Sequence, residues 1–373
     1  MNLNQYKNLF FKSSHLHLNN GGLSPIMKPA LDEINYWAKR FYEDGFYSDS
    51  DYMNKVDWTR LQVAKLIDCE KDEIAFFQSS AWGISQFAFG IELKKDDEVL
   101  LFDQEYSSNL YPWQQACLRN QAKLVLINSA EDLSVRVDKL VENITPQTKV
   151  VAISWVQFQT GAQIDLEKLS EICQGKKILL FVDAMQALGI HQLSFKKLSI
   201  DGMVCGSHKW LNAPVGVAFL AVKKELAMKM KPIAIGSSTY GSCDDSSDLV
   251  CAPKLNALKF EAGSKQVIEI CALGRSIEVI NQVGSKVLRE EAFRLANMLS
   301  SELSKLNFKV HASNLQPSQF INFSGSMDNK KIQKHLFDQG MHLPLRGPGV
   351  RITPHAFNTD DEIYRFMEIL KQI

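Results

Sequence analysis

The stretch KILLFVDAMQALG, residues 177–189, places an aspartate directly after the apolar run ILLFV. A continuous Val/Ile/Leu/Phe run is typical of a strand covered on both faces, because neither face has to meet water. The segment GMVCGSHKWLNAPVG (202–216) repeats the pattern and places Lys209 shortly after its apolar run. Ligands of open α/β sheets collect at the carboxyl ends of the strands, so both positions are candidate site residues.

Similar apolar runs alternate with amphipathic stretches up to about residue 262. The predicted strands lie at residues 73–77, 98–102, 123–127, 149–154, 177–182, 202–206 and 216–222. The predicted helices lie at residues 80–92, 107–120, 134–142 and 165–174. This alternation predicts the α/β fold class, with a mostly parallel, doubly wound sheet.

After residue 262 the pattern changes to that of a smaller α+β domain. A long helical stretch is expected to break near Gly284, and Thr359 opens a last helix with the spacing of a capping box. Between them lie strand-like segments at 308–312, 319–324 and 349–353 and a helix at 329–339. We therefore expect a large domain over residues 15–262 and a small domain over residues 263–373 that also includes the N-terminal segment 1–14.

The composition excludes several classes of protein. The 373 residues contain 42 Lys+Arg and 42 Asp+Glu, and a general nucleic-acid binder would carry a basic excess. The seven cysteines form no C-x-x-C pair and no Cys/His cluster, so neither a metal site nor a disulfide framework is expected. Apolar runs such as VGVAFLAV (215–222) are too short to cross a bilayer, and the start has no apolar signal segment. We expect a cytoplasmic globular protein without a nucleic-acid or membrane partner.

Two candidate residues carry the chemical argument. A carboxylate such as Asp183 at the end of an apolar strand is unfavourable unless it meets a partner. The alternative is that it caps a following helix. A lysine among apolar neighbours, such as Lys209, has a lowered pKa and becomes a nucleophilic amine, as Schiff-base chemistry requires. The alternative is an ordinary surface lysine.

A third signal lies in Gln-Ser-Ser-Ala-Trp (78–82), between a predicted strand and a predicted helix. Small residues there expose backbone amides at a helix N-terminus, which favours binding of a phosphate. Capping of the helix by a serine is the simpler alternative. Together, an aspartate, a lysine 26 residues later and an amide cradle match one cofactor, pyridoxal phosphate.

Eight short segments, in this order, resemble the class V aminotransferase family of fold type I pyridoxal-phosphate enzymes, which includes cysteine desulfurases and selenocysteine lyase-like enzymes. The segments are LNNGGLSP, QSSAWGI, DQEYSSNLYPW, SWVQFQTG, VDAMQALG, GSHKWLNAPVG, KFEAGS and VRITPHAFNT. The resemblance runs from about residue 18 to residue 363. The resemblance implies the fold type I architecture, a homodimer with a shared active site and a small amino-acid substrate.

The resemblance also implies roles for individual residues. Lys209 would form the aldimine with the cofactor, Asp183 would pair with the pyridine nitrogen, and Gln186 would approach the 3-oxygen of the ring. Tyr106 would stack on the ring face, and Arg351 would bind the substrate α-carboxylate through two hydrogen bonds. The residues implied for the phosphate are Ser80, Ala81, Ser207, His208 and, toward the partner subunit's phosphate, Ser264.

Simpler interpretations of three of these residues stay open. Arg351 alternates with apolar neighbours and could belong to the outward face of a strand. Tyr106 could be an ordinary amphipathic side chain, and His208 could only pack beside the lysine.

The chain departs from the desulfurase pattern in one catalytic feature. Desulfurases need a nucleophilic cysteine shortly before the C-terminal arginine, whereas no cysteine follows Cys271 here. Persulfide chemistry is therefore not expected. Cys243 and Cys251 lie in a polar loop, and whether either has a role stays open.

Two further departures concern cofactor contacts. In SWVQFQTG, Gln157 and Phe158 stand where desulfurases usually have an asparagine for the 3-oxygen, so whether Gln157 replaces it stays open. Gly206 stands where they often have a phosphate-binding Ser or Thr.

These observations favour an enzyme that acts on an α-amino acid, with transamination placed first. A carbon–sulfur or carbon–selenium lyase and an epimerase, for which Tyr106 is the candidate second base, are the alternatives. A non-catalytic cofactor-binding protein would lack the lysine or the arginine, and this chain has both. A nicotinamide-dependent dehydrogenase would need G-x-G-x-x-G after a strand, which the chain does not supply.

Overall fold

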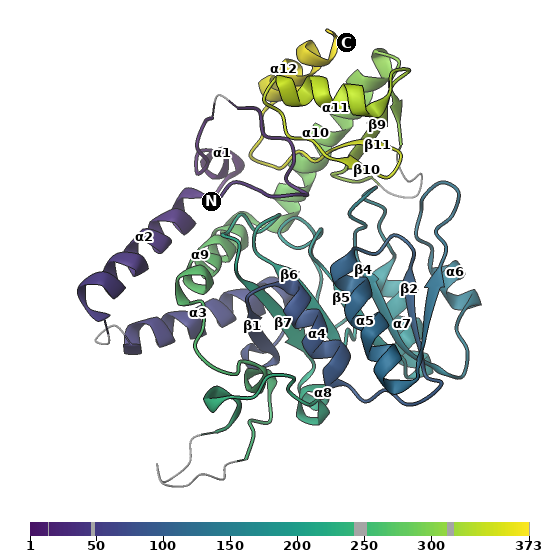
Figure 1. Cartoon of the computed structure of the whole chain (residues 1–373). Helices are drawn as coiled ribbons and strands as arrows, with labels where there is room; N and C mark the ends of the chain where they lie inside the picture. Colours follow the sequence, from purple (N-terminus) through teal and green to yellow (C-terminus); the bar gives the residue numbers. More distant parts are fainter. Residues whose placement is uncertain (14, 46–48, 242–251, 312–316, 373) are drawn as a thin grey trace.

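The structure, a computed structural model, describes residues 1–13, 15–45, 49–241, 252–311 and 317–372. Its elements form a larger sheet of seven strands and a smaller sheet of four, which lie one above the other in Figure 1. Cys243 and Cys251 lie outside the described residues.

The larger sheet has the strand order β1-β7-β6-β5-β4-β2-β3. Its strands are β1 (Ile74–Phe77), β2 (Glu98–Phe102), β3 (Lys123–Ile127), β4 (Thr148–Ser154), β5 (Leu179–Asp183), β6 (Gly202–Gly206) and β7 (Ala218–Val222). The strands from β6 to β3 pair in parallel, whereas β7 runs antiparallel to its neighbours β1 and β6. The predicted mostly parallel sheet is confirmed.

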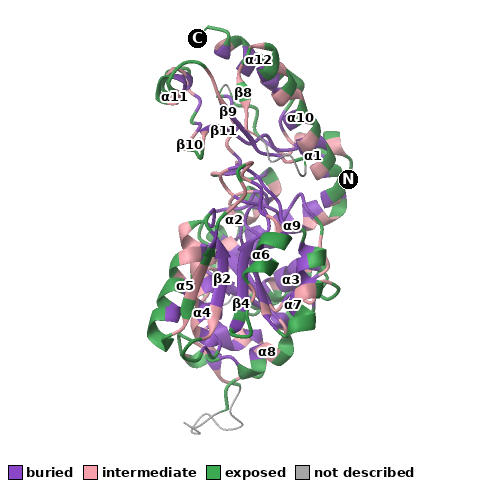
Figure 2. Cartoon of the chain, turned by 90° about the vertical axis from the view of Figure 1, so that its right-hand side faces the viewer, coloured by how far each residue is buried: buried purple, intermediate pink, exposed green. Residues whose placement is uncertain are grey.

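Helices cover both faces of this sheet, which explains the continuous apolar runs. In β5, Leu180 and Val182 pack into the apolar core on one face, and Phe181 packs into the core on the other. One face is covered by α4 (Ser80–Gly90), α5 (Ser107–Asn120) and α8 (Lys224–Lys229), the other by α3 (Asp49–Ile67), α6 (Val137–Glu142), α7 (Leu166–Lys176) and α9 (Val267–Val283). Figure 2 shows the buried strands between helices whose outer surfaces are exposed. No helix in these described ranges is long and apolar enough to cross a membrane.

Where element ends differ from the prediction, the backbone gives the reason. Lys177 has a φ of 58° and ends α7, so β5 begins two residues later than predicted. Asp165 accepts a hydrogen bond from the Lys168 amide and is the N-cap of α7 rather than its first residue. Gly284, with a φ of 90°, separates α9 from α10 (Ser285–Lys305) at the predicted break. The helices α1 (Leu3–Lys7), α2 (Lys28–Glu43) and α3 were not predicted.

The smaller sheet is antiparallel and has the order β10-β11-β9-β8. Its elements are β8 (Lys309–Val310), β9 (Ile321–Ser324), β10 (Leu345–Arg346) and β11 (Gly349–Ile352), with α11 (Asn329–Asp338) and α12 (Asp360–Leu370). Leu16 and Leu18 pack into the core of this part, whereas Tyr6, Phe10 and α9 pack into the core of the larger sheet. The division of the chain between residues 262 and 263 stays a prediction.

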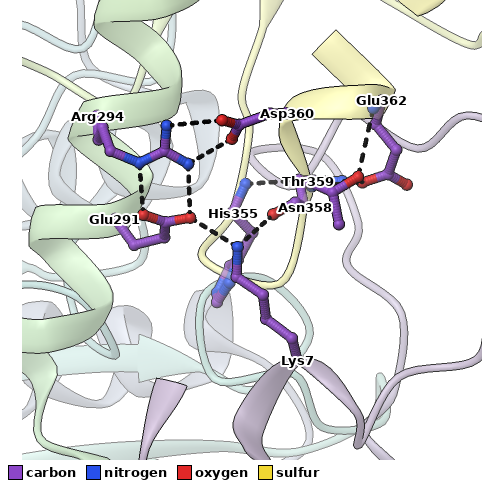
Figure 3. A network of polar contacts seen from close by, with 8 residues as sticks. All are labelled: Lys7, Glu291, Arg294, His355, Asn358, Thr359, Asp360 and Glu362. Carbon is purple, nitrogen blue, oxygen red and sulfur yellow. Dashed lines mark hydrogen bonds and ion pairs between the residues drawn. The ribbon is translucent and has the colours of Figure 1, made fainter. Parts of the chain in front are cut away.

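Charged residues tie the N-terminal segment to the C-terminal half of the chain (Figure 3). Lys7 Nζ lies 2.6 Å from Glu291 on α10 and donates to the Asn358 carbonyl at 2.9 Å. Arg294 binds Glu291 and also Asp360, the first residue of α12, at 2.5 Å. The predicted capping box is present at Thr359. This network fixes the turn that follows β11.

A buried ion pair joins α3 to the segment before α9. Arg60 lies 2.6 Å from Glu261 and also donates to the Ile74 carbonyl at 2.9 Å, and both charged side chains are 3% exposed. Glu261 also accepts a hydrogen bond from the Phe76 amide at 2.8 Å. Removing one partner of such a pair leaves an uncompensated charge in the interior.

We therefore expect Glu261→Gln to lower the free energy of unfolding by about 3 kcal/mol, because the buried Arg60 would keep only the exposed Asp57, 3.4 Å away, as a counter-charge. Urea unfolding followed by circular dichroism measures this change. The matched control is Asp338→Asn, which breaks the exposed pair with Lys334 and should cost less than about 1 kcal/mol. An equal loss of unfolding free energy in the two variants would show that the buried Arg60–Glu261 pair stabilises the fold no more than the exposed pair does.

Candidate active site

A cavity of about 480 Å³ opens at the carboxyl ends of β4, β5 and β6 and is closed on its other side by β10 and β11. This volume is in the range of small-molecule sites. The predicted site residues that line it are Ser80, Ala81, Tyr106, Asp183, Gln186, His208, Lys209 and Arg351. The structure therefore brings together side chains from distant parts of the chain.

Asp183, the last residue of β5, is 6% exposed and lines the cavity. Its Oδ1 atom accepts a hydrogen bond from the Met185 amide at 2.9 Å, but the residues that follow form turns and not a helix. Burial raises the pKa of Asp183 to about 6, and the nearby carboxylate of Glu105 raises it further while Lys209 opposes the shift. Asp183 therefore does not cap a helix, and the simpler alternative is wrong.

Lys209 follows β6 and is partly buried, with its Nζ atom 5.8 Å from the centroid of the Tyr106 ring. Burial lowers its pKa to about 8, the charge of Arg351 lowers it too, and Asp183 acts in the opposite direction. Near neutral pH a fraction of this amine is uncharged, which nucleophilic chemistry requires. The surface-lysine alternative does not apply.

The loop that carries Lys209 is held on several sides. The Ser207 hydroxyl donates to the Pro214 carbonyl, and the Tyr6 hydroxyl donates to Asn212 Oδ1 at 3.0 Å. Trp210 Nε1 donates to Gln186 Oε1 at 2.9 Å. These contacts restrict the lysine to the cavity wall.

Gln186 connects this loop to the N-terminal segment. Its Nε2 atom donates to the Gly21 carbonyl at 3.0 Å, while its Oε1 atom accepts from Trp210. Gly21 and Gly22 also line the cavity, and the sequence analysis gave them no role. Their place in the quoted segment LNNGGLSP is the signal that could have indicated one.

The N-terminus of α4 faces the cavity without a side-chain cap. Its N-cap residue, Ser79, has extended backbone and makes no capping hydrogen bond, and Ser79, Ser80 and Ala81 all line the cavity. Backbone amides in this position attract an anion. Burial lowers the pKa of the nearby His208 to about 4, with a further contribution from Lys209, so its ring is neutral at pH 7.

Two residues predicted to bind phosphate do not line this cavity. Ser207 is fully buried with its hydroxyl directed to Pro214, and Ser264 is exposed elsewhere on the chain. A Cβ atom at Gly206 would lie 2.8 Å from Met185 Cε, so Met185 occupies the space of a side chain there. The role predicted for Ser264 concerns a partner subunit and stays a prediction.

An aromatic pair forms part of the wall. Tyr106 is 45% exposed, and its ring meets the Phe158 ring edge to face at 5.0 Å. Gln157 is fully buried, does not line the cavity and donates from Nε2 to Glu105 at 2.8 Å. It therefore supports Glu105 rather than facing the site.

Glu105 was missed by the sequence analysis. Its buried carboxylate accepts hydrogen bonds from the Ser154 amide (2.8 Å), the Ser154 hydroxyl (2.5 Å), Gln157 (2.8 Å) and Asn109 (2.8 Å). Burial raises the pKa of Glu105, and these donors oppose that shift. A carboxylate soon after the apolar run EVLLF has the same signature that singled out Asp183.

Two arginines reach the cavity from the smaller sheet. Arg351 is 3% exposed, and its guanidinium donates to the Phe158 carbonyl at 2.6 Å and to Asn19 Oδ1 at 3.2 Å. Its Nε atom has no partner among the described residues. Burial lowers the pKa of Arg351 to about 10, and the charge of Arg346 contributes. Arg351 is thus not on an outward strand face, and Arg346 is a second cavity residue that the sequence analysis missed.

The fold and this site define a doubly wound α/β protein with a lysine and an aspartate facing one small-molecule cavity. The sequence profile described as Aminotransferase class-V matches residues 24–350. The chain belongs to this family, and it is a pyridoxal-phosphate-dependent enzyme that acts on amino acids.

Individual relatives agree with this assignment. The chain is 25% identical to a probable cysteine desulfurase of Pyrococcus abyssi, over 96% of this chain and 94% of the relative. It is 25% identical to the uncharacterized aminotransferase YcbU of Bacillus subtilis, over 96% of this chain and 95% of the relative. A probable cysteine desulfurase of Mycoplasma genitalium is 29% identical, over 69% of this chain and 62% of the relative. The crystal structure of the Escherichia coli cysteine desulfurase CsdA has the same fold, with a TM-score of 0.89 at 19% identity, covering 100% of this chain and 98% of that chain.

The cavity residues fit pyridoxal phosphate. The cofactor needs an amine for its aldehyde, an acid for its ring nitrogen and donors for its phosphate. Lys209, Asp183 and the uncapped N-terminus of α4 supply these three groups around one cavity. A protonated ring nitrogen beside Asp183 would compensate the charge of this buried carboxylate.

Asp183 generates a prediction for the cofactor-free protein. Its folded-state pKa of about 6 lies above the ordinary 3.8, so its favourable contribution to stability is complete below about pH 4 and is lost as the pH rises through about 6. We expect the free energy of unfolding of the wild type to fall relative to that of Asp183→Asn over this range. Urea unfolding of both cofactor-free proteins at several pH values measures the difference. A difference that is constant with pH, or that changes in the opposite direction, contradicts the raised pKa.

Proposed function

We propose that this protein is an aminotransferase that uses pyridoxal phosphate to convert an α-amino acid to its keto acid. The observation that carries this proposal is a cavity with an amine of lowered pKa, Lys209, and no thiol among its described lining residues. Transamination needs only the amine, whereas desulfuration through a persulfide needs a cysteine as well.

The described cysteines are unsuited to nucleophilic chemistry. All of them are buried, and none lines the cavity: Cys69, Cys117, Cys173, Cys205 and Cys271. Burial raises the pKa of the Cys173 and Cys271 thiols to about 12. A thiol with such a pKa is protonated at neutral pH and is a poor nucleophile.

When bound, pyridoxal phosphate supplies an aldehyde and a ring that accepts the electrons left at the substrate Cα. Lys209 Nζ would bind the aldehyde and later take the proton from Cα. The Asp183 carboxylate would hold a proton on the ring nitrogen, which keeps the ring electron-withdrawing. Gln186 would lie near the 3-oxygen of the ring, and Tyr106 would cover the ring face.

The remaining contacts would orient the two anionic ends. The amides of Ser80 and Ala81, with His208, would hold the phosphate at the N-terminus of α4. Arg351 would bind the α-carboxylate, and its hydrogen bonds to the Phe158 carbonyl and to Asn19 Oδ1 orient the guanidinium for this task. Ser207 would support the lysine loop rather than the phosphate, because its hydroxyl is directed to Pro214.

A carbon–sulfur lyase is the second candidate function. It is favoured by the relatives of Pyrococcus abyssi and Mycoplasma genitalium, which carry the name cysteine desulfurase. A β-elimination from cysteine that releases sulfide would need Lys209 as the base but no cysteine nucleophile. The two functions differ in their products, because transamination forms a keto acid from the amino acid and the lyase releases sulfide.

We further propose a cytoplasmic homodimer. Large apolar side chains near the cavity are exposed in the single chain, namely Leu23 (53%), Trp82 (45%) and Tyr111 (58%). Aromatic residues are enriched in subunit interfaces, where their apolar surface leaves water. In such a dimer, Ser264 would reach the partner's phosphate.

We expect the purified protein to sediment as a species of twice the chain mass of 42.1 kDa. The double variant Trp82→Asp, Tyr111→Asp should shift it toward the monomer, because charged side chains at a buried interface core are unfavourable. Analytical ultracentrifugation measures both. A monomeric wild type, with cofactor present, would contradict the shared site.

The function is tested with the cofactor-loaded protein and a panel of amino acids that includes alanine and cysteine. Transamination predicts that an amino acid changes the visible absorption of the cofactor and that the matching keto acid forms only up to one equivalent until an amino acceptor is added. Release of sulfide from cysteine would support the lyase instead. A protein that binds no pyridoxal phosphate would contradict both functions.

Lys209→Ala provides the control for this experiment. Borohydride should attach the cofactor covalently to the wild type, at a peptide that contains Lys209, and should attach none to the variant. Mass spectrometry of the digested proteins measures the attachment. Turnover should fall by at least about a thousandfold in the variant, because covalent and general-base catalysis would both be lost. Full turnover would exclude the lysine role.

A further inference from the structure

Arg346 is held at the cavity by its backbone. It is the last residue of β10 and pairs with Gly349 of β11 in the antiparallel ladder. Its carbonyl accepts a hydrogen bond from Asn322 Nδ2 at 2.5 Å. Its side chain is exposed but lines the cavity, and its Cζ atom lies 6.0 Å from the centroid of the Phe158 ring. The guanidinium therefore lies at the cavity and not on a part of the surface away from it.

The charges around the cavity leave this guanidinium without a counter-charge. The charged residues that line it are Asp183, Lys209, Arg346 and Arg351. Within the described ranges, Arg346 forms no ion pair, and its guanidinium donates only to the Leu345 carbonyl at 3.2 Å. Its positive charge lowers the pKa of both Arg351 and Lys209, after the larger effect of burial on each.

The proposed function accounts for every charge at the site except this one. Lys209 would bind the cofactor aldehyde, Asp183 the ring nitrogen and Arg351 the α-carboxylate. The phosphate would lie at the N-terminus of α4, a helix that packs against the larger sheet, whereas Arg346 lies on β10 of the smaller sheet. Arg346, Lys209 and Arg351 give this side of the cavity an excess of positive charge, which favours binding of an anion there.

Phe158 shows how one substrate could reach both arginines. Its carbonyl accepts the hydrogen bond from Arg351 Nη1, and its ring faces the Arg346 guanidinium. Both guanidinium groups thus lie near one residue, and the two arginines come from neighbouring strands of the same sheet. An amino acid whose α-carboxylate binds Arg351 can extend its side chain along Phe158 toward Arg346.

We propose that Arg346 binds an anionic group on the side chain of the substrate, so that the enzyme acts on α-amino acids with an acidic side chain. This inference rests on the proposed function and adds the substrate class to it. A carboxylate or a phosphate is the matching group, because both accept two parallel hydrogen bonds from a guanidinium.

The test compares acidic amino acids with neutral partners of similar shape. The cofactor-loaded protein is titrated with aspartate and asparagine, glutamate and glutamine, and phosphoserine and serine, and the cofactor absorbance reports binding. We expect each acidic member that fits to bind at least about tenfold more tightly than its neutral partner, as a charge-assisted hydrogen bond supports. The pair with the largest ratio identifies whether the anion is a carboxylate or a phosphate, and at which chain length.

Variants assign this preference to Arg346. Arg346→Gln should lower the acidic-to-neutral ratio by about tenfold, and Arg346→Lys should keep part of it, because it keeps the charge but loses the bidentate geometry. The matched control is Arg119→Gln, since Arg119 is also exposed and its Cζ atom lies 4.6 Å from the Phe89 ring, away from this cavity. It should keep the wild-type ratio. Competition by succinate and by succinamate, which lack an amino group, measures the same preference without any reaction at the cofactor.

Each outcome bears on the proposal. A wild-type ratio near one in all three pairs, or an equal loss for acidic and neutral members in Arg346→Gln, overturns it. If alanine changes the absorbance and forms pyruvate while acidic substrates have no advantage, the proposed function stands and this inference alone fails. If borohydride attaches no cofactor to Lys209, the proposed function itself has failed.

Discussion

The burial of Asp183 is the constraint on which the site depends. The residue is 6% exposed, and a second carboxylate, that of Glu105, lies close enough to raise its pKa. Water cannot stabilise this charge, so the sheet edge needs a positive group directly in front of it. Lys209 supplies part of that compensation in the single chain, and the protonated nitrogen of a bound cofactor ring would supply the rest.

Much of the surrounding structure keeps these groups in place. Gln186 joins the lysine loop to the N-terminal segment through Trp210 and Gly21, and Tyr6 holds the same loop from α1. Glu105 is surrounded by donors that keep it beside the cavity without exposing it. The rigidity of the site therefore comes from buried hydrogen bonds that link segments far apart in the sequence.

The departures from the desulfurase pattern have local physical reasons. Met185 fills the space that a side chain at position 206 would need, and Gln157 Nε2 donates its hydrogen bond to Glu105. The segment before Arg351 places Arg346, rather than a thiol, at the cavity.

The sequence by itself determined the α/β class, most element positions, the cofactor and the strand-end residues Asp183 and Lys209, because apolar periodicity and short motifs act locally. It did not predict α2 and α3, whose stability comes from packing against α9. Only the tertiary structure decided that the Ser207 hydroxyl is directed to Pro214 and that the Glu105 carboxylate lies close to Asp183. It also decided that Arg346 and Arg351 line the same cavity. Burial and long-range contacts settle these questions, and neither can be read from the order of the residues alone.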